Sequence, residues 1–273
     1  MNKCFYHNAD LDGHCAGASV KNFISDAELI GINYGDEFPW ETIKKEDAVY
    51  MVDFSIQPFS NMLKLRSLCE LTWIDHHKSA IEECGSTSFM GIQQDGVGAC
   101  ALVWHHFASD APLAVRLLAE YDVWNHKDPS TLPFQYGLKL ENTHPSNEVL
   151  WHSLFEAGQA ELDPVILRGE TILKYMAQEN EKYIKACAFE TELNGLKCIA
   201  VNKMLTNSQL FDSIWNHDKY DAMLTFSFRK GKWTVSLYST KPDVDVSTIA
   251  KTRGGGGHKG AAGFQCDYIP FRI

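Results

Sequence analysis

Short apolar runs alternate with amphipathic stretches through the first half of the chain, and this alternation is the strongest constraint on its fold. Buried strands are predicted at residues 3–6, 28–34, 48–52 and 71–74. Apolar residues recur at helical spacing in the intervening stretches 13–24 and 59–69. Strands that alternate with helices predict a mostly parallel sheet with helices on both faces, so we expect an α/β protein.

Helical patterns continue after residue 99 and end in one long periodic stretch. Helices are predicted at 99–107, 112–121 and 148–157, and a helix over 164–186 is predicted to connect two domains. Beyond it, Asn194-Gly195 and Lys230-Gly231 each separate two β-prone runs and predict hairpins, with a helix at 209–215 between them. We therefore predict an N-terminal domain at 1–163, a connecting helix at 164–187 and a smaller α+β domain at 188–273.

The 273 residues carry a formal net charge of −10 at pH 7. Proteins that bind long nucleic acids use a basic surface to neutralise phosphates, and no Lys/Arg cluster here exceeds two residues. We expect no binding to long duplexes, whereas binding of short anionic substrates is compatible with this charge. No window approaches 18 uncharged apolar residues and the N-terminus lacks the apolar core of a signal peptide, so we expect neither a membrane span nor secretion.

Eight cysteines occur in the chain, none of them in a CxxC motif, and most lie within apolar runs. Reduced thiols in a cytoplasmic protein fit this pattern better than a disulfide framework or a zinc finger. We therefore expect a cytoplasmic protein, present as a monomer or a homodimer.

Side chains that bind metal ions follow three of the four predicted strands. They are His7, Asp10 and Asp12 after the first strand, Asp53 after the third, and Asp75-His76-His77 after the fourth. Ligands of open parallel sheets bind beyond the carboxyl ends of the strands, so these clusters are expected to share one crevice. Carboxylates and imidazoles without thiolates suit Mn²⁺ or Mg²⁺, and the histidines favour Mn²⁺. Two metal ions roughly 4 Å apart could neutralise the carboxylates and clamp a phosphoryl group.

Each of these residues, taken alone, also has a structural explanation. Asp10 and Asp53 could each cap a helix, and a single His77 could be an ordinary polar residue. The Asp-His-His triplet and the convergence of three clusters favour metal binding over these alternatives.

Four segments resemble the motifs of the DHH phosphoesterases. They are Asp10-Leu11-Asp12, Val52-Asp53-Phe54-Ser55, Asp75-His76-His77 and a later aspartate, for which Asp122 is the candidate. The family includes nanoRNases, RecJ-type exonucleases, cyclic-dinucleotide phosphodiesterases and, more distantly, family II pyrophosphatases. In this chain two residues separate His7 from Asp10, whereas many members of the family have three.

The resemblance implies a role for each of these residues. Asp53 would bridge two metal ions. The remaining ligands would be His7 and Asp10 at one ion, and Asp12, His76 and Asp122 at the other. His77 would act at the substrate phosphate, and Asp75 would orient a histidine. The alternative for Asp122 is a cap at the end of a helix.

Four consecutive glycines, residues 254–257, stand between Arg253 and His258. A flexible linker is one reading, but only 16 residues follow the fourth glycine. Glycine lets backbone amides approach an anion closely, and the flanking cations add charge. The segment resembles the GGGGH loop of the DHH-associated C-terminal domain. The resemblance makes 1–163 the catalytic metal-binding domain and 188–273 the substrate-binding domain. Substrate would be bound by Arg253, Gly255, Gly256, Gly257 and His258.

Three functions remain after these comparisons of residues and motifs. The first is a nanoRNase-like exonuclease that hydrolyses short oligonucleotides to 5′-mononucleotides with two divalent cations. The second is a small-molecule phosphatase or phosphodiesterase acting on 3′-phosphoadenosine 5′-phosphate or on linear or cyclic dinucleotides. The third is a catalytically inactive nucleotide-binding regulator, which would be expected to lack some of the metal ligands. Because every ligand position can be filled, the hydrolase is the prediction.

Overall fold

The computed structural model describes residues 1–272, and the chain divides into two compact units, Met1–Leu173 (unit 1) and Lys174–Ile273 (unit 2). Unit 1 is built on a four-stranded sheet in the order β2-β1-β3-β4. Its strands are β1 (Asn2–His7), β2 (Glu28–Ile32), β3 (Ala48–Val52) and β4 (Glu70–Ile74). All neighbouring strands are parallel, which confirms the predicted sheet.

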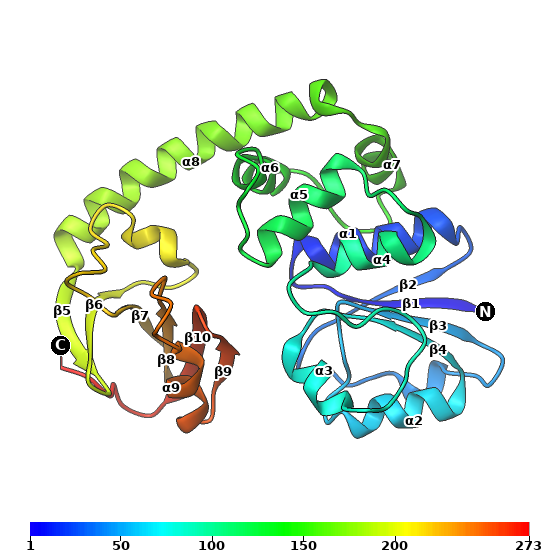
Figure 1. Cartoon of the computed structure of the whole chain (residues 1–273), viewed down its shortest axis with the longest axis horizontal. Coiled ribbons are helices and arrows are strands. Elements are labelled where there is room, and N and C mark those ends of the chain that lie inside the picture. Colours follow the sequence, from blue (N-terminus) through cyan, green and yellow to red (C-terminus); the bar gives the residue numbers. More distant parts are fainter. Residues whose placement is uncertain (273) are drawn as a thin grey trace. The chain divides into compact units, whose positions relative to one another are not determined.

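Helices cover both faces of this sheet (Figure 1). Because side chains alternate along a strand, Cys4 and Tyr6 pack into the core on one face and Phe5 into the core on the other. The first face is covered by α1 (Leu11–Phe23) and α4 (Ala99–Phe107), and α5 (Leu113–Asp122), α6 (Thr131–Leu138) and α7 (Glu148–Glu156) extend the same core by packing with these two helices or with one another. The second face is covered by α2 (Ser60–Leu68) and α3 (Lys78–Cys84), with the short 3₁₀ helix η1 (Trp40–Thr42) nearby.

The long helix α8 (Gln159–Cys187) begins in unit 1 and ends in unit 2. It covers the predicted connecting helix and starts five residues earlier than residue 164. The Glu161 side chain accepts a hydrogen bond from the backbone N–H of Gly158 at 3.0 Å, which satisfies one of the donors that a helix start leaves free. The division of the chain into a catalytic and a substrate-binding domain stays a prediction.

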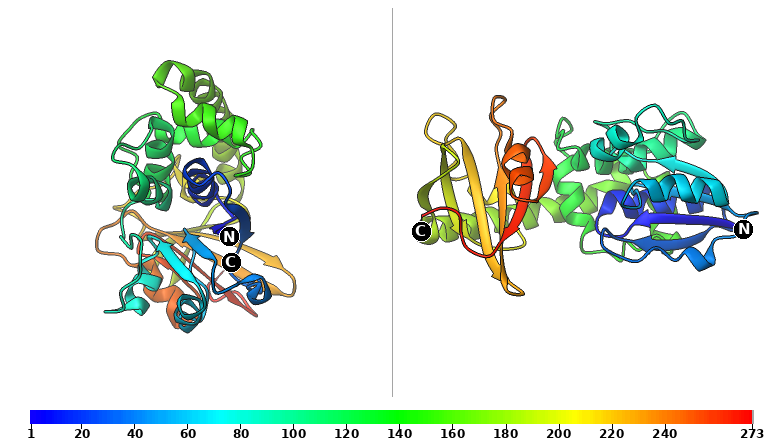
Figure 2. Two further views of the ribbon diagram at one scale, coloured as in Figure 1. Left: turned by 90° about the vertical axis from the view of Figure 1, so that its right-hand side faces the viewer. Right: turned by 90° about the horizontal axis from the view of Figure 1, so that it is seen from below.

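Unit 2 contains a six-stranded mixed sheet in the order β5-β6-β7-β8-β10-β9. The strands are β5 (Phe189–Leu193), β6 (Leu196–Asn202), β7 (Ala222–Arg229), β8 (Lys232–Tyr238), β9 (Gly256–His258) and β10 (Ala261–Cys266). Both predicted hairpins form, with Asn194 and Lys230 at positive φ in the two turns. The β7–β8 hairpin, yellow to orange, projects beyond its neighbours in the right-hand view of Figure 2. Helix α9 (Val246–Thr252) packs into the core on one face of the sheet.

The helix predicted at residues 209–215 is wrong. A 3₁₀ helix, η2 (Ser208–Phe211), replaces it and is followed by turns. The side chain of Asn207 accepts a hydrogen bond from the N–H of Gln209 at 3.1 Å, and that of Asn216 accepts one from the N–H of Asp218 at 2.9 Å. Such side-chain bonds compete with the backbone pattern of an α-helix. Helices α3, α6 and α9 were not predicted, because each is only seven or eight residues long.

No helix among residues 1–272 combines the length and apolar character needed to cross a membrane. The eight cysteines are all free of disulfide bonds, as expected.

Candidate metal centre

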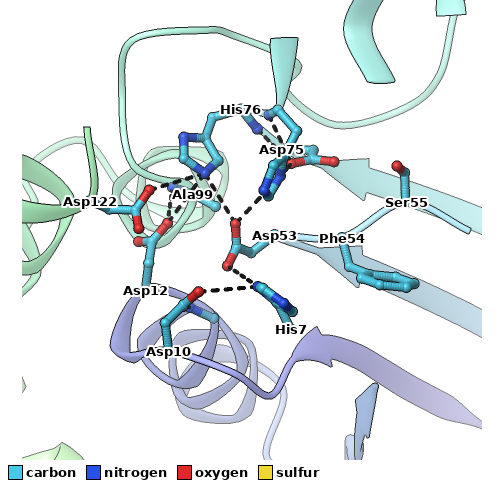
Figure 3. A network of polar contacts seen from close by, with 12 residues as sticks. His7, Asp10, Asp12, Asp53, Phe54, Ser55, Asp75, His76, Ala99 and Asp122 are labelled. Atoms are coloured by element: carbon cyan, nitrogen blue, oxygen red, sulfur yellow. Dashed lines mark hydrogen bonds and ion pairs between the residues drawn. The ribbon is translucent and has the colours of Figure 1, made fainter. Parts of the chain in front are cut away.

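The carboxyl ends of β1, β3 and β4 bring the predicted ligands of unit 1 into one cluster (Figure 3). His7 is the last residue of β1, and Asp53 follows the last residue of β3. Asp75 and His76 directly follow β4. Asp10 caps α1 by accepting a hydrogen bond from the N–H of Gly13 at 2.9 Å. Asp10 is therefore a helix cap, as one of the two alternatives predicted, and this does not exclude metal binding by the same side chain.

Three groups of side chains are close enough for each group to hold a metal ion. The groups are His7, Asp10 and Asp53; Asp12, His76 and Asp122; and Asp53, Asp75, His76 and His77. The six residues predicted as metal ligands all occur in these groups. Asp122 lies at the end of α5 and reaches the cluster from a helix, not from a strand.

Asp53 lies between the first two groups. Its Oδ2 is 3.5 Å from Nδ1 of His7, and its Oδ1 is 3.2 Å from Nε2 of His76. The same His76 nitrogen is 3.3 Å from Oδ2 of Asp122 and 3.8 Å from Oδ2 of Asp12. One carboxylate thus presents one oxygen to each group of ligands. The backbone of Asp53 has φ +56°, in the left-handed region that costs a residue with a Cβ.

Asp12 is held in place by the start of a helix far away in the sequence. Its two carboxylate oxygens accept hydrogen bonds from the backbone N–H groups of Ala99, at 2.6 Å, and Cys100, at 2.9 Å. These N–H groups open α4, whose own N-cap residue, Gly98, has no side chain to satisfy them. Positive charge at a helix N-terminus favours a carboxylate there, so α4 fixes the position of Asp12 and partly offsets the cost of burying its charge.

Asp75 is completely buried and orients the histidines beside it. Its Oδ1 accepts hydrogen bonds from the backbone N–H of His76 at 2.7 Å and of His77 at 3.1 Å, and lies 2.7 Å from Nδ1 of the His77 ring. Its Oδ2 accepts a hydrogen bond from the indole of Trp73 at 3.2 Å. With three N–H groups or ring nitrogens around Oδ1 and the Trp73 indole at Oδ2, Asp75 is better placed to hold His77 than to bind an ion.

Burial and mutual repulsion hold protons on this cluster. Burial, helped by the charge of Asp53, raises the pKa of Asp12 to about 7. Burial and the charge of Asp12 likewise raise the pKa of Asp122 to about 7. Burial acts to lower the pKa of His7 and His76, but the neighbouring carboxylates outweigh it and raise each to about 10. The carboxylates of the cluster therefore need bound protons or bound cations to balance their negative charge.

The residues present fit a pair of divalent cations. Asp53 Oδ1 and His7 Nδ1 are buried and make no hydrogen bond of regular geometry, although each lies 3.2 Å from an atom of opposite charge. Buried polar atoms without hydrogen bonds are rare and point to a missing partner. The donor set is oxygen and imidazole nitrogen without thiolate, which suits hard or borderline divalent ions.

The predicted substrate-binding residues lie in unit 2. Arg253 donates a hydrogen bond to Oδ1 of Asn194 at 2.8 Å, and its guanidinium lies 5.3 Å from the ring centre of Phe264. The expectation of a glycine loop needs correction, because Gly256, Gly257 and His258 form strand β9 at the sheet edge, paired with β10. A Cβ would meet the carbonyl oxygen of Gly263 at 2.1 Å from Gly255 and the Cα of Ala262 at 2.5 Å from Gly257, so these two glycines are needed for close strand packing.

Other residues at the cluster escaped the sequence analysis. Tyr34, just beyond β2, has its ring centre 5.6 Å from that of His7 and 6.0 Å from that of His77. His14 bridges two segments that are far apart in the sequence. One ring nitrogen lies 3.1 Å from Oδ1 of Asn8, between His7 and Asp10, and the other lies 3.1 Å from Oγ1 of Thr143 in the loop before α7. Tyr34 is the last residue of the strand predicted at 28–34, which was a usable signal, whereas the contact between His14 and Thr143 spans 129 residues and gave no signal in the sequence.

The comparisons with known sequences are sparse. No protein-family model matches the chain. Uncharacterized protein R106 of Acanthamoeba polyphaga mimivirus is 28% identical over 243 residues, covering 85% of this chain and 55% of the viral protein. The chain thus spans about half the length of this curated relative.

Solved structures resemble the whole chain more clearly. The pGpG-specific phosphodiesterase PggH from Vibrio cholerae is 12% identical with a TM-score of 0.56, covering 97% of this chain and 93% of that one. The DHH domain of a member of the s1p family of ribosomal proteins is 14% identical with a TM-score of 0.57, covering 96% and 82%. An exopolyphosphatase-related protein from Bacteroides fragilis is 12% identical with a TM-score of 0.53, covering 98% and 87%.

These likenesses show that the chain has the two-domain α/β fold found in a DHH-domain protein. The resemblance to the DHH proteins is thereby confirmed at the level of the fold. The strand-end cluster of acidic and histidine side chains adds a site that could hold divalent metal ions.

Proposed function

We propose that this chain is a metal-dependent phosphoesterase that hydrolyses short oligonucleotides to 5′-mononucleotides. The observation that carries the proposal is the position of Asp53, whose two oxygens face two separate ligand groups. One carboxylate shared between two ligand sets is the arrangement needed to hold two ions a few ångströms apart. When bound, such ions supply charge that stabilises a phosphoryl group and lowers the pKa of water.

We assign the ligands of one ion as His7, Asp10 and Asp53, and those of the other as Asp12, His76, Asp122 and Asp53. Mn²⁺ is the favoured ion because histidine nitrogens contribute to both sets, whereas Mg²⁺ is usually bound through oxygen. The hydrogen bonds from Ala99 and Cys100 to Asp12 keep one ligand rigid. Ligands held in advance lose little freedom when an ion binds.

His77 is the candidate to act on the phosphate. Burial acts to lower its pKa, but the hydrogen-bonded Asp75 outweighs that effect and raises the pKa, which favours the protonated ring. Its Nδ1 faces Asp75, 2.7 Å away, and lies 3.8 Å from Oδ1 of Asp53. We propose that the other ring nitrogen donates a hydrogen bond to a phosphate oxygen and that Asp75 positions the ring for it.

We propose a short substrate on the basis of the net charge of the chain and of one protein with a similar fold. A net charge of −10 opposes the approach of long polyanions, so short ones are favoured. PggH, which shares the fold, is specific for the dinucleotide pGpG, which supports a substrate of that scale. In unit 2, Arg253 and the N–H groups near Gly255 are the proposed contacts for a phosphate. Eight free cysteines support a location in the reducing cytoplasm.

Product analysis tests this proposal. Labelled dinucleotides and oligonucleotides of increasing length are incubated with the Mn²⁺-loaded protein, and the products are separated. We expect 5′-mononucleotides, released fastest from the shortest substrates, and none from Asp53→Asn. Asp110→Asn, which neutralises an exposed aspartate, is the matched control and should behave as wild type. Hydrolysis confined to inorganic pyrophosphate would contradict the proposal. Activity on 3′-phosphoadenosine 5′-phosphate alone would favour the small-molecule phosphatase.

A further inference from the structure

Three aromatic rings gather in the segment that begins beside the ligand Asp122. Tyr121 precedes Asp122, and Trp124 and His126 follow it in the loop after α5. The ring centres of Trp124 and His126 are 4.4 Å apart, and those of Tyr121 and Trp124 are 5.6 Å apart. Tyr121 and His126 are stacked with an interplanar angle of 16°. The rings therefore form one connected aromatic cluster next to a proposed metal ligand.

Trp124 is placed in a way that packing alone does not explain. Its side chain is 46% exposed, although an indole is among the most favourable groups to bury. Its backbone has φ +55°, a left-handed conformation that is unfavourable for a bulky side chain. Isolated exposed apolar residues are common on protein surfaces, so the exposure of Trp124 gains weight from its backbone strain and its place beside a proposed metal ligand. Strained residues cluster at binding and catalytic sites.

The loop that carries Trp124 is fixed by a single carboxylate. Glu120 accepts hydrogen bonds from the backbone N–H of Lys127, from that of Asp128 at 3.1 Å, and from the hydroxyl of Thr131 at 2.7 Å. The carbonyl of Glu120 also accepts a hydrogen bond from the N–H of Asn125 at 2.9 Å. These bonds hold both ends of the segment 121–128. The backbone that carries the exposed indole is therefore held in position before any ligand binds, which reduces the entropy that binding would cost.

Trp124 is also close along the chain to the proposed ligand Asp122. The N–H of Trp124 donates a hydrogen bond to the carbonyl oxygen of Tyr121 at 3.0 Å, so the chain turns back immediately after Asp122. Two peptide units separate the Cα atoms of Asp122 and Trp124, a reach of roughly 7 Å at most. A substrate phosphate at the Asp122 group would have its attached nucleoside at about this range.

We propose that Trp124 stacks on a nucleobase of the substrate and selects phosphoesters that carry a base over inorganic polyphosphate. The inference rests on the proposed function, because it needs a phosphoester bound at the cluster. Stacking on an aromatic side chain is tolerant of sequence, since every base has a π-face. A chain of bare phosphates offers nothing to stack, so the indole distinguishes the two classes of substrate.

Steady-state kinetics with paired substrates test the proposal. The pair is the dinucleotide pApA and an analogue in which one adenine is replaced by hydrogen, both with Mn²⁺. Two analogues are tested, each lacking one of the two bases, to find which base lies on the Trp124 side. The quantity compared is then the kcat/KM for pApA divided by the kcat/KM for the analogue that lacks that base. In Trp124→Ala we expect this ratio to fall about tenfold, mainly through KM, because one stacked base is lost. Trp124→Phe should keep most of the wild-type ratio, because phenylalanine can still stack on a base.

A binding measurement separates stacking from a structural role. A dinucleotide containing 2-aminopurine is titrated into the protein with Ca²⁺ in place of Mn²⁺, and stacking quenches its fluorescence. Quenching should persist in Trp124→Phe and be lost in both Trp124→Ala and Trp124→Leu, the second of which keeps an apolar side chain at the strained position. Val149→Ala, at an 84% exposed residue of α7, is the control.

The outcomes for the two proposals differ. If wild type cleaves pApA and the substrate ratio is unchanged in Trp124→Ala and Trp124→Leu, the stacking proposal is overturned and the phosphoesterase stands. If wild type cleaves no nucleotide ester, the proposed function fails. The fluorescence titration then still decides whether Trp124 binds a base, with quenching that survives in Trp124→Leu counting against it.

Discussion

At Asp53 the backbone turns into the left-handed region directly after β3, and the carboxylate it carries is almost completely buried. Such a conformation costs on the order of 1–3 kcal/mol, and a buried carboxylate without full pairing adds to that. The sequence identified Asp53 as a metal ligand because it follows a predicted strand, and the resemblance to the DHH phosphoesterases implied its bridging role. It could not predict the strain, which depends on how the turn is packed.

Replacing Asp53 by Asn should abolish activity while leaving the fold intact. Asn tolerates the left-handed conformation, but its neutral side chain cannot balance the charge of two cations. We expect loss of tight Mn²⁺ binding at both positions and a fall in kcat/KM of roughly a thousandfold or more. Equilibrium dialysis against Mn²⁺, with circular dichroism to check folding, provides the measurement. Full Mn²⁺ stoichiometry in the variant would rule out the bridging role.

Metal binding should release protons near neutral pH. Asp12 and Asp122 have pKa values raised to about 7 in the metal-free protein, and His7 and His76 hold protons up to about pH 10. Bound ions need ionised carboxylates and neutral imidazoles, so binding displaces these protons. Since raising the pH removes the competing protons, Mn²⁺ affinity should increase from about pH 6 to about pH 8.

Calorimetric titrations of Mn²⁺ in two buffers of different ionisation enthalpy count the protons released. A heat of binding that is independent of the buffer would contradict the protonated cluster.

At the scale of elements, the site depends on how α4 and α5 pack on each other. Helix α4 fixes Asp12 through its first N–H groups, and α5 ends in Asp122. Strand ends were predictable because parallel strands share one edge, so residues distant in sequence meet there. The place of Asp122 at the end of α5 was not predictable, because the position of a helix end relative to a sheet depends on packing. Asp122 was therefore identified only through the resemblance to a family.

Gly98→Ala should weaken the metal site from a distance. A Cβ at Gly98 would lie 2.5 Å from the Cα of Ala119 in α5, too close without moving one of the two helices. We expect the free energy of unfolding to fall by about 1–3 kcal/mol and Mn²⁺ to bind more weakly, because Asp12 and Asp122 move apart. Thermal denaturation with and without Mn²⁺ measures both effects.

Gly158→Ala is the matched control for Gly98→Ala. Its new Cβ would meet only the movable end of the Glu161 side chain, at 3.2 Å. An equal loss of stability in both variants would show that packing between α4 and α5 is not the cause.

For the whole molecule, the predicted chemistry is divided between two units with separate cores. All predicted metal ligands lie in unit 1, and the glycine segment with Arg253 lies in unit 2. The sequence predicted both units and the two hairpins from local patterns, because turns such as Asn194-Gly195 are determined by a few neighbouring residues. The edge strand formed by Gly256–His258 was missed, because glycine carries no β-propensity and its pairing depends on distant residues.

Arg253→Ala should separate substrate binding from metal binding. If Arg253 contacts a phosphate, its loss removes a charge-assisted hydrogen bond and should lower kcat/KM about tenfold or more, mainly through KM. Mn²⁺ stoichiometry and affinity, measured by calorimetry without substrate, should match wild type. Arg116→Ala, at an exposed arginine of α5, is the control. A variant with normal kinetics would exclude Arg253 from the substrate contacts.

The metal groups draw their side chains from residues as far apart as His7 and Asp122. An unfolded chain cannot assemble such a set, so an ion binds the folded state alone and stabilises it by mass action. At a free ion concentration of about 100 times its Kd, one bound ion adds about 2.7 kcal/mol, a large share of the stability of an ordinary domain. The supply of metal in the cell would then govern how long each molecule escapes proteolysis. Scarcity of the metal would lower the amount of the protein as well as its activity.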